Sequence, residues 1–266
     1  MLLGLDHLVV AVPDPDAAAA ELERTVGLAC TGGGRHPLWG TFNRLAWLGD
    51  TYVELIGVSD RSLTPLGAVS RAVAAALEAG HAGLVTYAVA SDDLDADLAR
   101  LRAGGSDLGE IEARSRARPD GEVVRWRASF PPRLGPAEPP FVIEHELSGA
   151  EWGEAARAAR ASLVHPLGSG ARIAALELPV ANIEAAAIAY SRTVGVQCSD
   201  IDPRSAHAAI GAQAVRLHHG APLWNPAVVE LTIEGADSSR DNAGIADIAA
   251  AREIDAVGVR WRILGY

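Results

Sequence analysis

The chain repeats one short motif at two widely separated places, and this repeat constrains its fold more than any other feature. The stretch ELERTVGLACT at 21–31 resembles AYSRTVGVQCS at 189–199, with a constant offset of 168 between matching positions such as Arg24 and Arg192. An apolar run precedes each copy, and an alanine-rich amphipathic segment joins the run to the motif. The sequence therefore predicts, twice, a strand followed by a helix that ends at a glycine, Gly27 or Gly195.

Each copy continues into further strand candidates, so both read as β-α-β-β-β units. The expected helix N-caps are Asp14 or Asp16 in the first copy and Asn182 in the second. A weaker third copy follows residue 82. A trimmed fourth copy ends the chain, with strands near 227–235 and 257–264 and a short helix near 243–252.

Four such units predict an α+β fold class, in which repeated β-α-β-β-β modules pair into two half-barrel sheets with helices outside. We expect an N-terminal paired-module domain at 1–150, a linker at 151–170 and a degenerate paired-module domain at 171–266. A chain of 266 residues is long enough for two domains that each bury a core.

The composition excludes several classes of function. The chain has no lysine, so all 23 cationic side chains are arginine, which excludes Schiff-base chemistry, a pyridoxal phosphate anchor and a phosphate-loop lysine. A net charge of −11 disfavours nucleic acid as a partner. No apolar run reaches the roughly 18 residues of a membrane-spanning helix. The first residues lack the positively charged segment of a signal peptide, so we do not expect a secretory signal. We therefore expect a cytoplasmic protein without a membrane partner.

Several motifs resemble those of one protein family. They are the strand LDHLVVAV at 5–12, the loop GGGRHPLWGTFN at 32–43, the strand YVELIGV at 52–58, RARPDG at 116–121 with Trp126, Ile143-Glu144, and HPLG at 165–168. Together they resemble the glyoxalase-like domain proteins, a branch of the vicinal oxygen chelate superfamily that also holds bleomycin-resistance proteins and dioxygenases. The resemblance covers residues 3–170 well and the remainder weakly.

This resemblance implies a metal and a substrate inside the paired modules, with metal ligands on the first and last strands of each module. His7, Glu54 and Glu144 line up with that set, while Thr86 stands where a second histidine would be. One imidazole with two carboxylates suits a divalent metal such as Zn, Mn, Ni or Fe(II). We therefore expect these three residues to bind such an ion.

Structural interpretations of the same residues stay open. His7 could bond to a backbone carbonyl, Glu54 could pair with Arg44 or Arg127, and Glu144 could lie on an exposed edge. The second copy of the repeat argues for a site, because it keeps the helix end but not these residues. Ala175 stands at the position of His7 and, once Gly49 is aligned with Gly211, Arg216 stands opposite Glu54.

The loop at 32–43 is expected to serve the same site. Its glycines allow positive φ and a close approach to a ligand, and such loops commonly cross the mouth of a pocket. We expect Arg35 to hold a carboxylate, His36 to move a proton, Trp39 to cover the site, and Thr41 and Asn43 to add polar contacts. The alternative is a structural bulge whose polar groups bond to one another.

Five arginines gather at 114–127 of an otherwise acidic chain. Guanidinium groups match carboxylates and phosphates, so we expect one or two of them to bind an anionic substrate, with Arg118 and Trp126 as the substrate-binding candidates. The alternative is a solvated hairpin, because Pro119-Asp120-Gly121 is a strong turn signal.

The function that these expectations favour is a metal-dependent enzyme of the lyase or isomerase type. It would act on a small oxygenated, anionic metabolite through an enediolate-like intermediate, with His36 and Glu144 moving the proton. A dioxygenase is disfavoured because the second histidine is missing. The alternatives are a metal-free protein that sequesters a ligand in a cleft of Trp39, Trp47 and Trp126, and a partner-binding domain pair, in either case with a possible homodimer.

Overall fold

The computed structural model describes residues 2–221, 226–233 and 251–265, and it forms the repeated motif as the same strand and helix in both places. β1 (Leu2–Ala11) leads to α1 (Pro15–Val26), and β9 (Arg172–Val180) leads to α6 (Ile183–Val194). Asp14, rather than Asp16, caps α1 by accepting backbone N–H bonds, and Asn182 caps α6 in the same way. Both helices end at a left-handed glycine, as predicted from the repeat.

Eight strands from the first 145 residues close into a barrel in the order β1-β4-β3-β2-β6-β7-β8-β5. The first module adds β2 (Gly32–His36), β3 (Thr41–Leu48) and β4 (Thr51–Val58) to β1 and α1. The second consists of β5 (Gly83–Ser91), α3 (Leu94–Ala103), β6 (Glu112–Ala117), β7 (Val123–Ser129) and β8 (Phe141–His145). The predicted α+β modules are confirmed, but the first sheet closes fully, because β2 also pairs with β6.

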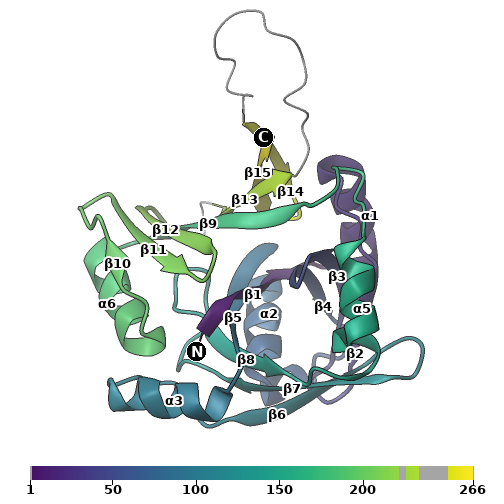
Figure 1. Ribbon diagram of the computed structural model, residues 1–266, viewed down its shortest axis with the longest axis horizontal. Helices are drawn as coiled ribbons and strands as arrows, with labels where there is room; N and C mark the ends of the chain where they lie inside the picture. Colours follow the sequence, from purple (N-terminus) through teal and green to yellow (C-terminus); the bar gives the residue numbers. More distant parts are fainter. Residues whose placement is uncertain (1, 222–225, 234–250, 266) are drawn as a thin grey trace, which may run out of the picture.

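The second half of the chain forms an open sheet in the order β10-β11-β12-β9-β13-β15-β14. Its further strands within the described residues are β10 (Cys198–Ser199), β11 (Ser205–Ile210), β12 (Gln213–His219), β13 (Val228–Ile233), β14 (Arg252–Ala256) and β15 (Val259–Gly265). The helix expected near 243–252 falls almost wholly on residues outside the described ranges, and Arg252 begins β14. Figure 1 shows this sheet above the barrel, with α6 beside it.

The two sheets share one apolar core, which lies between the outer face of the barrel and the helix-covered face of the second sheet. Leu8 and Val10 of β1 face this core together with Leu176 and Leu178 of β9. Each fully buried leucine contributes about 1.5–3 kcal/mol to stability. The alternate residues of β1, among them Val9, face the barrel interior instead. The back-to-back packing therefore leaves the inside of the barrel available for a site.

Helices close the barrel at both ends. After the short η1 (Thr64–Leu66), α2 (Ala68–Glu78) packs its Val73 against Val9 and Ala11 at one end. The segment expected as a linker forms α4 (Gly149–Trp152) and α5 (Glu154–Ala161), and Trp152 packs against Trp47 and His145 at the other end. None of the described helices is long and apolar enough to cross a membrane.

Candidate functional site

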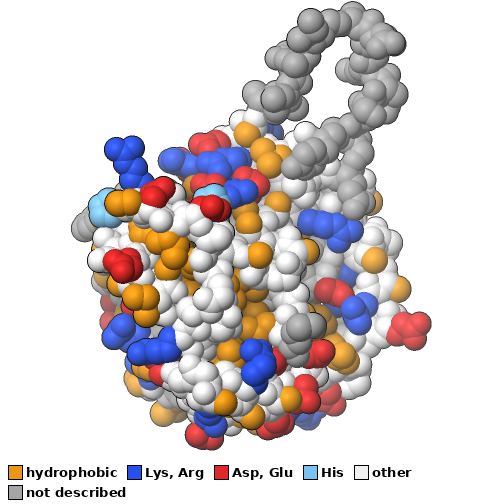
Figure 2. Space-filling view, turned by 60° about the vertical axis from the view of Figure 1, so that its left-hand side comes forward, with side chains coloured by type: hydrophobic (Ala, Val, Ile, Leu, Met, Phe, Trp, Pro, Cys, Tyr) orange, Lys and Arg blue, Asp and Glu red, His pale blue; other side chains and the backbone are white. Residues whose placement is uncertain are grey.

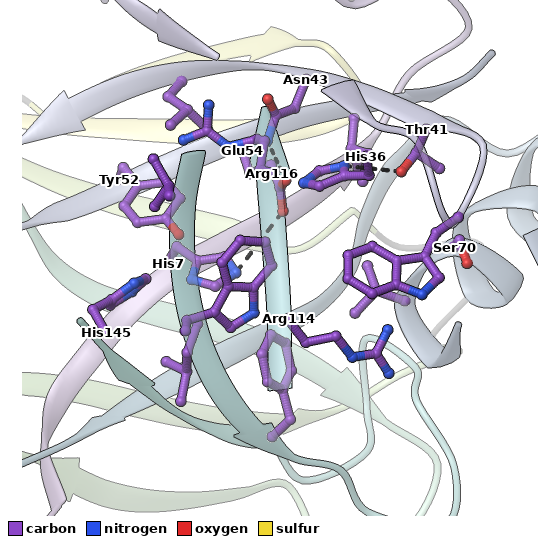
Figure 3. Close-up of a pocket in the computed structure, with 18 of the residues that line it drawn as sticks. His7, His36, Thr41, Asn43, Tyr52, Glu54, Ser70, Arg114, Arg116 and His145 are labelled. Atoms are coloured by element: carbon purple, nitrogen blue, oxygen red, sulfur yellow. Dashed lines mark hydrogen bonds and ion pairs between the residues drawn. The ribbon is translucent and has the colours of Figure 1, made fainter. Parts of the chain in front are cut away.

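The barrel contains a cavity of about 70 Å³ that is partly open to solvent. A buried water molecule needs roughly 10–15 Å³ of such volume, so the cavity has room for a small ligand rather than a large one. One part of the wall is apolar and aromatic, and another is polar (Figure 3). The polar lining consists of His7, His36, Thr41, Asn43, Tyr52, Glu54, Ser70, Arg114, Arg116, His145 and Glu151.

His7 is held in one orientation by its neighbours. Its Nδ1 lies 2.6 Å from Oδ1 of Asp6, and its ring stacks on Tyr52 at 4.6 Å between centroids. Asp6 also accepts from Nε2 of His145, which is 3.1 Å from each carboxylate oxygen. An ionised carboxylate only accepts hydrogen bonds, so Nδ1 of His7 carries a proton that it donates to Asp6.

The charge of Asp6 follows from its surroundings. Burial opposes the charged carboxylate, but the favourable interactions with His145 and His7 outweigh it and hold the pKa of Asp6 well below its usual range. Asp6 is therefore ionised throughout the neutral range. Sequence reasoning missed both Asp6 and His145, although each is adjacent to a residue that it had singled out.

Glu54 faces His7 across the cavity wall. Its Oε2 lies 3.8 Å from Nε2 of His7, too far for a hydrogen bond, and its Oε1 accepts from Nδ2 of Asn43 at 2.6 Å. The expected alternative partners are engaged elsewhere, since Arg44 pairs with Asp16 and Arg127 with Asp95. Nε2 of His7 and Oε2 of Glu54 thus lie side by side on the cavity wall.

The prediction that Glu144 joins His7 and Glu54 is wrong. In β8, Phe141, Ile143 and His145 line the cavity, and Glu144 points to the opposite face. There it pairs with Arg127 and accepts the backbone N–H of Leu94 at 3.0 Å, at the start of α3. Glu144 therefore stabilises a helix end and an ion pair, and it can neither bind a metal with His7 nor move a proton in the cavity.

In the second module, neither of the two expected ligand positions carries a metal-binding side chain. The helix caps Asp14 and Asp93 are related by an offset of 79, which places Thr86 at the position of His7 and Ala88 at that of Val9. Val9 pairs with Glu54, and Ala88 pairs with Phe141. Phe141 is thus the counterpart of Glu54, and the four-ligand pattern is reduced to two residues.

The residues of the cavity do not fit a three-ligand metal centre. The described part of the chain contains no cluster of three or more histidine, cysteine, aspartate or glutamate side chains arranged to hold an ion. His7 and Glu54 alone provide two donors, fewer than the three or four protein ligands of protein zinc sites. The expected Zn, Mn, Ni or Fe(II) centre of His7, Glu54 and Glu144 is therefore not supported by this donor set.

The loop at 32–43 is part of the barrel wall rather than a flap. It forms β2, a turn and the start of β3, and alternation sends His36, Thr41 and Asn43 into the cavity. Trp39 also lines the cavity, as expected. Arg35 does not, because it is exposed and its guanidinium lies over the ring of Phe42.

The glycines of β2 allow strands, not a ligand, to approach closely. A Cβ at Gly34 would lie 2.2 Å from the carbonyl oxygen of Ala117 on β6, and one at Gly33 would lie 2.3 Å from that of Asn43. Side chains at these positions would hold β2 away from its neighbours. The glycines therefore permit the barrel to close, and the expected role in ligand approach is wrong.

His36 is a neutral hydrogen-bonding group at neutral pH. Burial lowers its pKa to about 4, and Arg116 and Arg114 act in the same direction against the opposing effect of Glu54. Its Nδ1 lies 2.9 Å from the hydroxyl of Thr41. The imidazole can thus donate or accept a hydrogen bond in the cavity without carrying charge.

Two of the five clustered arginines enter the cavity, but Arg118 is not one of them. Arg114 and Arg116 line the cavity from β6, and Trp126 lines it from β7 as expected. Arg118 lies at the hairpin turn and pairs with Asp120 at 2.8 Å, outside the cavity. Arg125, on the opposite face of β7, is exposed.

The segment between the two sheets contributes one acidic residue to the cavity. Glu151 of α4 contacts Nη2 of Arg116 with both carboxylate oxygens, at 2.6 and 2.7 Å. Arg116 also donates to the carbonyl of Gly33. Nothing in the sequence indicated that Glu151 lines the cavity. It lies 35 positions beyond Arg116, in the helical segment between the two sheets.

In the described part of the second sheet, an arginine with acidic partners stands where the barrel has Glu54. Val9 pairs with Glu54 and Glu177 with Arg216, so the offset of 168 puts Arg216 at the place of Glu54, as the sequence alignment predicted. Arg216 is neutralised by Glu177 and Glu230, at 3.1 and 3.0 Å. Figure 2 shows arginine and acidic side chains close together at the top of the molecule, where this sheet lies.

Comparisons with known proteins agree with this architecture. The family model described as "Glyoxalase-like domain" matches residues 5–194. No curated protein matches the chain. A hypothetical protein from Staphylococcus aureus superposes with a TM-score of 0.76 at 14% identity, covering 98% of this chain and 99% of its own.

Two other solved structures match parts of this chain. A mutant of 4-hydroxymandelate synthase from Streptomyces coelicolor has a TM-score of 0.51 at 13% identity, covering 88% of this chain and 72% of its own. Methylmalonyl-CoA epimerase from Mycobacterium tuberculosis has a TM-score of only 0.39 at 21% identity, over 54% of this chain and 88% of its own. At these identities the likeness concerns the fold alone.

Proposed function

Since this chain belongs to the glyoxalase-like domain family, we propose that its barrel binds a small oxygenated metabolite and catalyses a proton transfer of the lyase or isomerase type. The observation that carries the proposal is the alignment of Asp6, His7 and Glu54 in the barrel cavity. The ionised Asp6 fixes the His7 proton on Nδ1, so the free Nε2 is directed at the cavity as a base.

The chemistry begins with His7. Its Nε2 takes a proton from a carbon next to a carbonyl, the electron pair of the C–H bond moves onto the carbonyl oxygen, and an enediolate-like anion results. Asp6 stabilises the imidazolium that forms, because the two atoms are already 2.6 Å apart. Return of the proton from Nε2 to the former carbonyl carbon, with passage of the ligand's hydroxyl proton through Glu54 to the anionic oxygen, completes an isomerisation. Loss of a leaving group with its bonding electrons from the carbon on the far side of the deprotonated carbon, as the carbonyl re-forms and the new C=C bond is made, completes an elimination.

The developing negative oxygen needs donors in a cavity with little water. His36 is neutral there and offers an N–H, and the guanidinium of Arg114 lies on the wall of the same cavity. Glu54, held by Asn43, is placed to accept a hydroxyl proton of the ligand. These roles require no metal, which agrees with the two-donor set of the cavity.

A specific observation favours one competing function, a metal-free protein that binds a ligand without reaction. Aromatic side chains form much of the cavity wall, and Trp39 and Trp126 lie with ring centroids 6.4 Å apart. Such walls suit ligand capture by apolar contact. Trp47 does not line the cavity but packs beneath α4, so the expected three-tryptophan cleft is reduced to two.

Proton exchange separates the two functions. Small 2-hydroxy and 2-oxo aldehydes, ketones and acids are incubated with the protein in deuterium oxide, and loss of the signal of the C–H next to the carbonyl is followed by proton NMR. We expect exchange with the wild type, before and after dialysis against EDTA, and a rate about 10²–10⁴ lower with His7→Gln. Replacement of the exposed His207 by glutamine is the matched control.

The possible results have distinct meanings. Ligand binding without exchange in the wild type supports sequestration and overturns the catalytic proposal. Exchange that disappears with EDTA shows that a metal is needed and overturns the metal-free mechanism. Exchange that His7→Gln leaves intact shows that another residue is the base.

A further inference from the structure

The two arginines that β6 sends into the cavity are in different states. Arg116 has an exposed fraction of only 4% and is occupied on both sides, by the carboxylate of Glu151 and by the carbonyl of Gly33. A guanidinium with its charge neutralised and its donors engaged has little left to offer a ligand. Arg116 therefore ties α4 to the barrel.

Arg114 is incompletely satisfied. Its side chain is 8% exposed, and one end of the guanidinium pairs with Glu112, which is half-exposed at the rim. The Nε atom is buried and has no hydrogen-bond partner among the described residues. A buried donor on a charged group that lacks an acceptor costs more than about 1–3 kcal/mol, so an acceptor supplied by a ligand would bind favourably there.

Aromatic rings fix the position of this guanidinium. Its central carbon lies 4.5 Å from the ring centroid of Trp39 and 5.1 Å from that of Phe130. Stacking of this kind restricts the side chain before any ligand arrives. In Figure 3, Arg114 extends toward the side of the pocket that carries Ser70, away from Arg116.

We propose that Arg114 is the specificity-determining residue of the cavity and that it binds the carboxylate of a small organic acid. This inference rests on the proposed function and adds the substrate class to it. The open position is a donor, so the ligand group must be an acceptor, and a charged acceptor forms the stronger hydrogen bond.

The rest of the cavity agrees with such a ligand. The aromatic walls accommodate the apolar part of a small acid whose carboxylate lies at Arg114. The volume of about 70 Å³ limits the ligand to a small acid. The ligand class is therefore a small 2-hydroxy or 2-oxo carboxylic acid, whose reacting carbon lies next to an oxygenated carbon.

Binding of paired acids and amides tests this proposal. Lactate, pyruvate and benzoate are titrated into the protein by calorimetry, each beside its uncharged amide. We expect the acids to bind and the amides to bind at least about tenfold more weakly, because a hydrogen bond between charged groups is lost. In Arg114→Met the affinity for the acids should fall about 10- to 100-fold, and Arg114→Lys should keep part of it.

The control is Arg125→Met on the same hairpin, which faces away from the cavity and should bind the acids like the wild type. Thermal unfolding confirms that each variant is folded. Removal of the Arg114 guanidinium leaves only the half-exposed Glu112 without its partner, so folding is not expected to fail.

Three results would each overturn the proposal. They are equal affinities for acids and amides, no binding of any acid to the wild type, and undiminished binding of the acids to Arg114→Met. The proton-exchange experiment reports separately on the chemistry. Acid binding that depends on Arg114 without any exchange supports the ligand class and contradicts the catalytic function. Exchange that is insensitive to Arg114→Met supports the catalytic function and contradicts the ligand class.

Discussion

The protonation of His36 gives the most direct test of the electrostatics in the cavity. In the folded protein burial lowers its pKa to about 4, whereas the ordinary value is 6.5. As the pH falls below 6.5, the unfolded chain takes up a proton at His36 and the folded protein does not. Stability is therefore lost between pH 6.5 and pH 4, and above pH 6.5 this residue contributes no pH dependence.

The magnitude follows from the difference between the two pKa values. Each unit of difference between the folded and unfolded pKa corresponds to about 1.4 kcal/mol. At pH 5 the lowered pKa of His36 therefore reduces the free energy of unfolding by about 2 kcal/mol. His36→Asn keeps a polar atom near Thr41 but does not titrate. We expect the wild type to lose about 2 kcal/mol more than this variant when the pH is lowered from 7.5 to 5.

Urea unfolding of the wild type and of His36→Asn at pH 7.5 and pH 5 measures the difference between their losses of stability. This double difference isolates His36, because every other titrating group is present in both chains. The slope of unfolding free energy against urea concentration must agree between the variants for the comparison to hold. Replacement of the exposed His207 by asparagine is the control. A double difference below about 0.5 kcal/mol would refute the reasoning, since it would mean that the folded protein accepts a proton at His36 without difficulty.

Two further substitutions test how the barrel is held to its surroundings. Gly258 has φ +73°, and a Cβ there would lie 2.2 Å from the carbonyl oxygen of Ala82, whereas Gly121 has φ +89° with open space around it. Gly258→Ala should therefore lower the unfolding free energy by at least about 1 kcal/mol more than Gly121→Ala, and equal losses in urea unfolding would contradict the close approach. Glu151→Gln should cost about 3–5 kcal/mol because it leaves the charge of Arg116 buried without its partner. A loss below about 1 kcal/mol would show that the pair is not held as described.

The architecture could be predicted from the sequence because the repeat carries backbone requirements. A helix that ends at Gly27 or Gly195 in the left-handed conformation needs glycine at that position, and an N-cap needs a short polar side chain. These requirements persist even where side chains differ. Closure of the first sheet was not predictable, because it depends on contacts between β2 and β6 across two modules.

The sequence of β8 does not show which of its two faces points into the cavity. In a barrel that is buried on both sides, apolar residues occupy both faces of a strand, so alternation alone leaves two possible phases. Phe141 and Ile143 face the cavity while Val142 packs toward α3. Either Glu144 or His145 could therefore have faced the cavity. The family resemblance indicated Glu144, whereas the structure places His145 there.

Asp6 escaped prediction for a different reason. Strand alternation places adjacent residues on opposite faces, so a strand whose His7 faces the cavity is expected to point Asp6 away from it. The pairing of β1 with β5 is irregular between Leu5 and His7, which brings the Asp6 carboxylate within reach of two imidazoles. A local irregularity of this kind re-aims side chains and leaves no signal in the hydrophobic pattern.

The second sheet shows what the fold requires when no site has to be kept. Its Ala175 and Arg216 stand where the barrel has His7 and Glu54, and the positive charge of Arg216 is matched by Glu177 and Glu230. Glu54 is a buried carboxylate that accepts one hydrogen bond, from Asn43, among the described residues, and a further donor from a ligand would lower the cost of its burial. In the second sheet the charge at the same position is matched by ion pairs, so no comparable cost arises. The barrel keeps a buried carboxylate beside His7 despite its cost, and this contrast within one chain is the strongest physical reason to propose that His7 and Glu54 belong to one site.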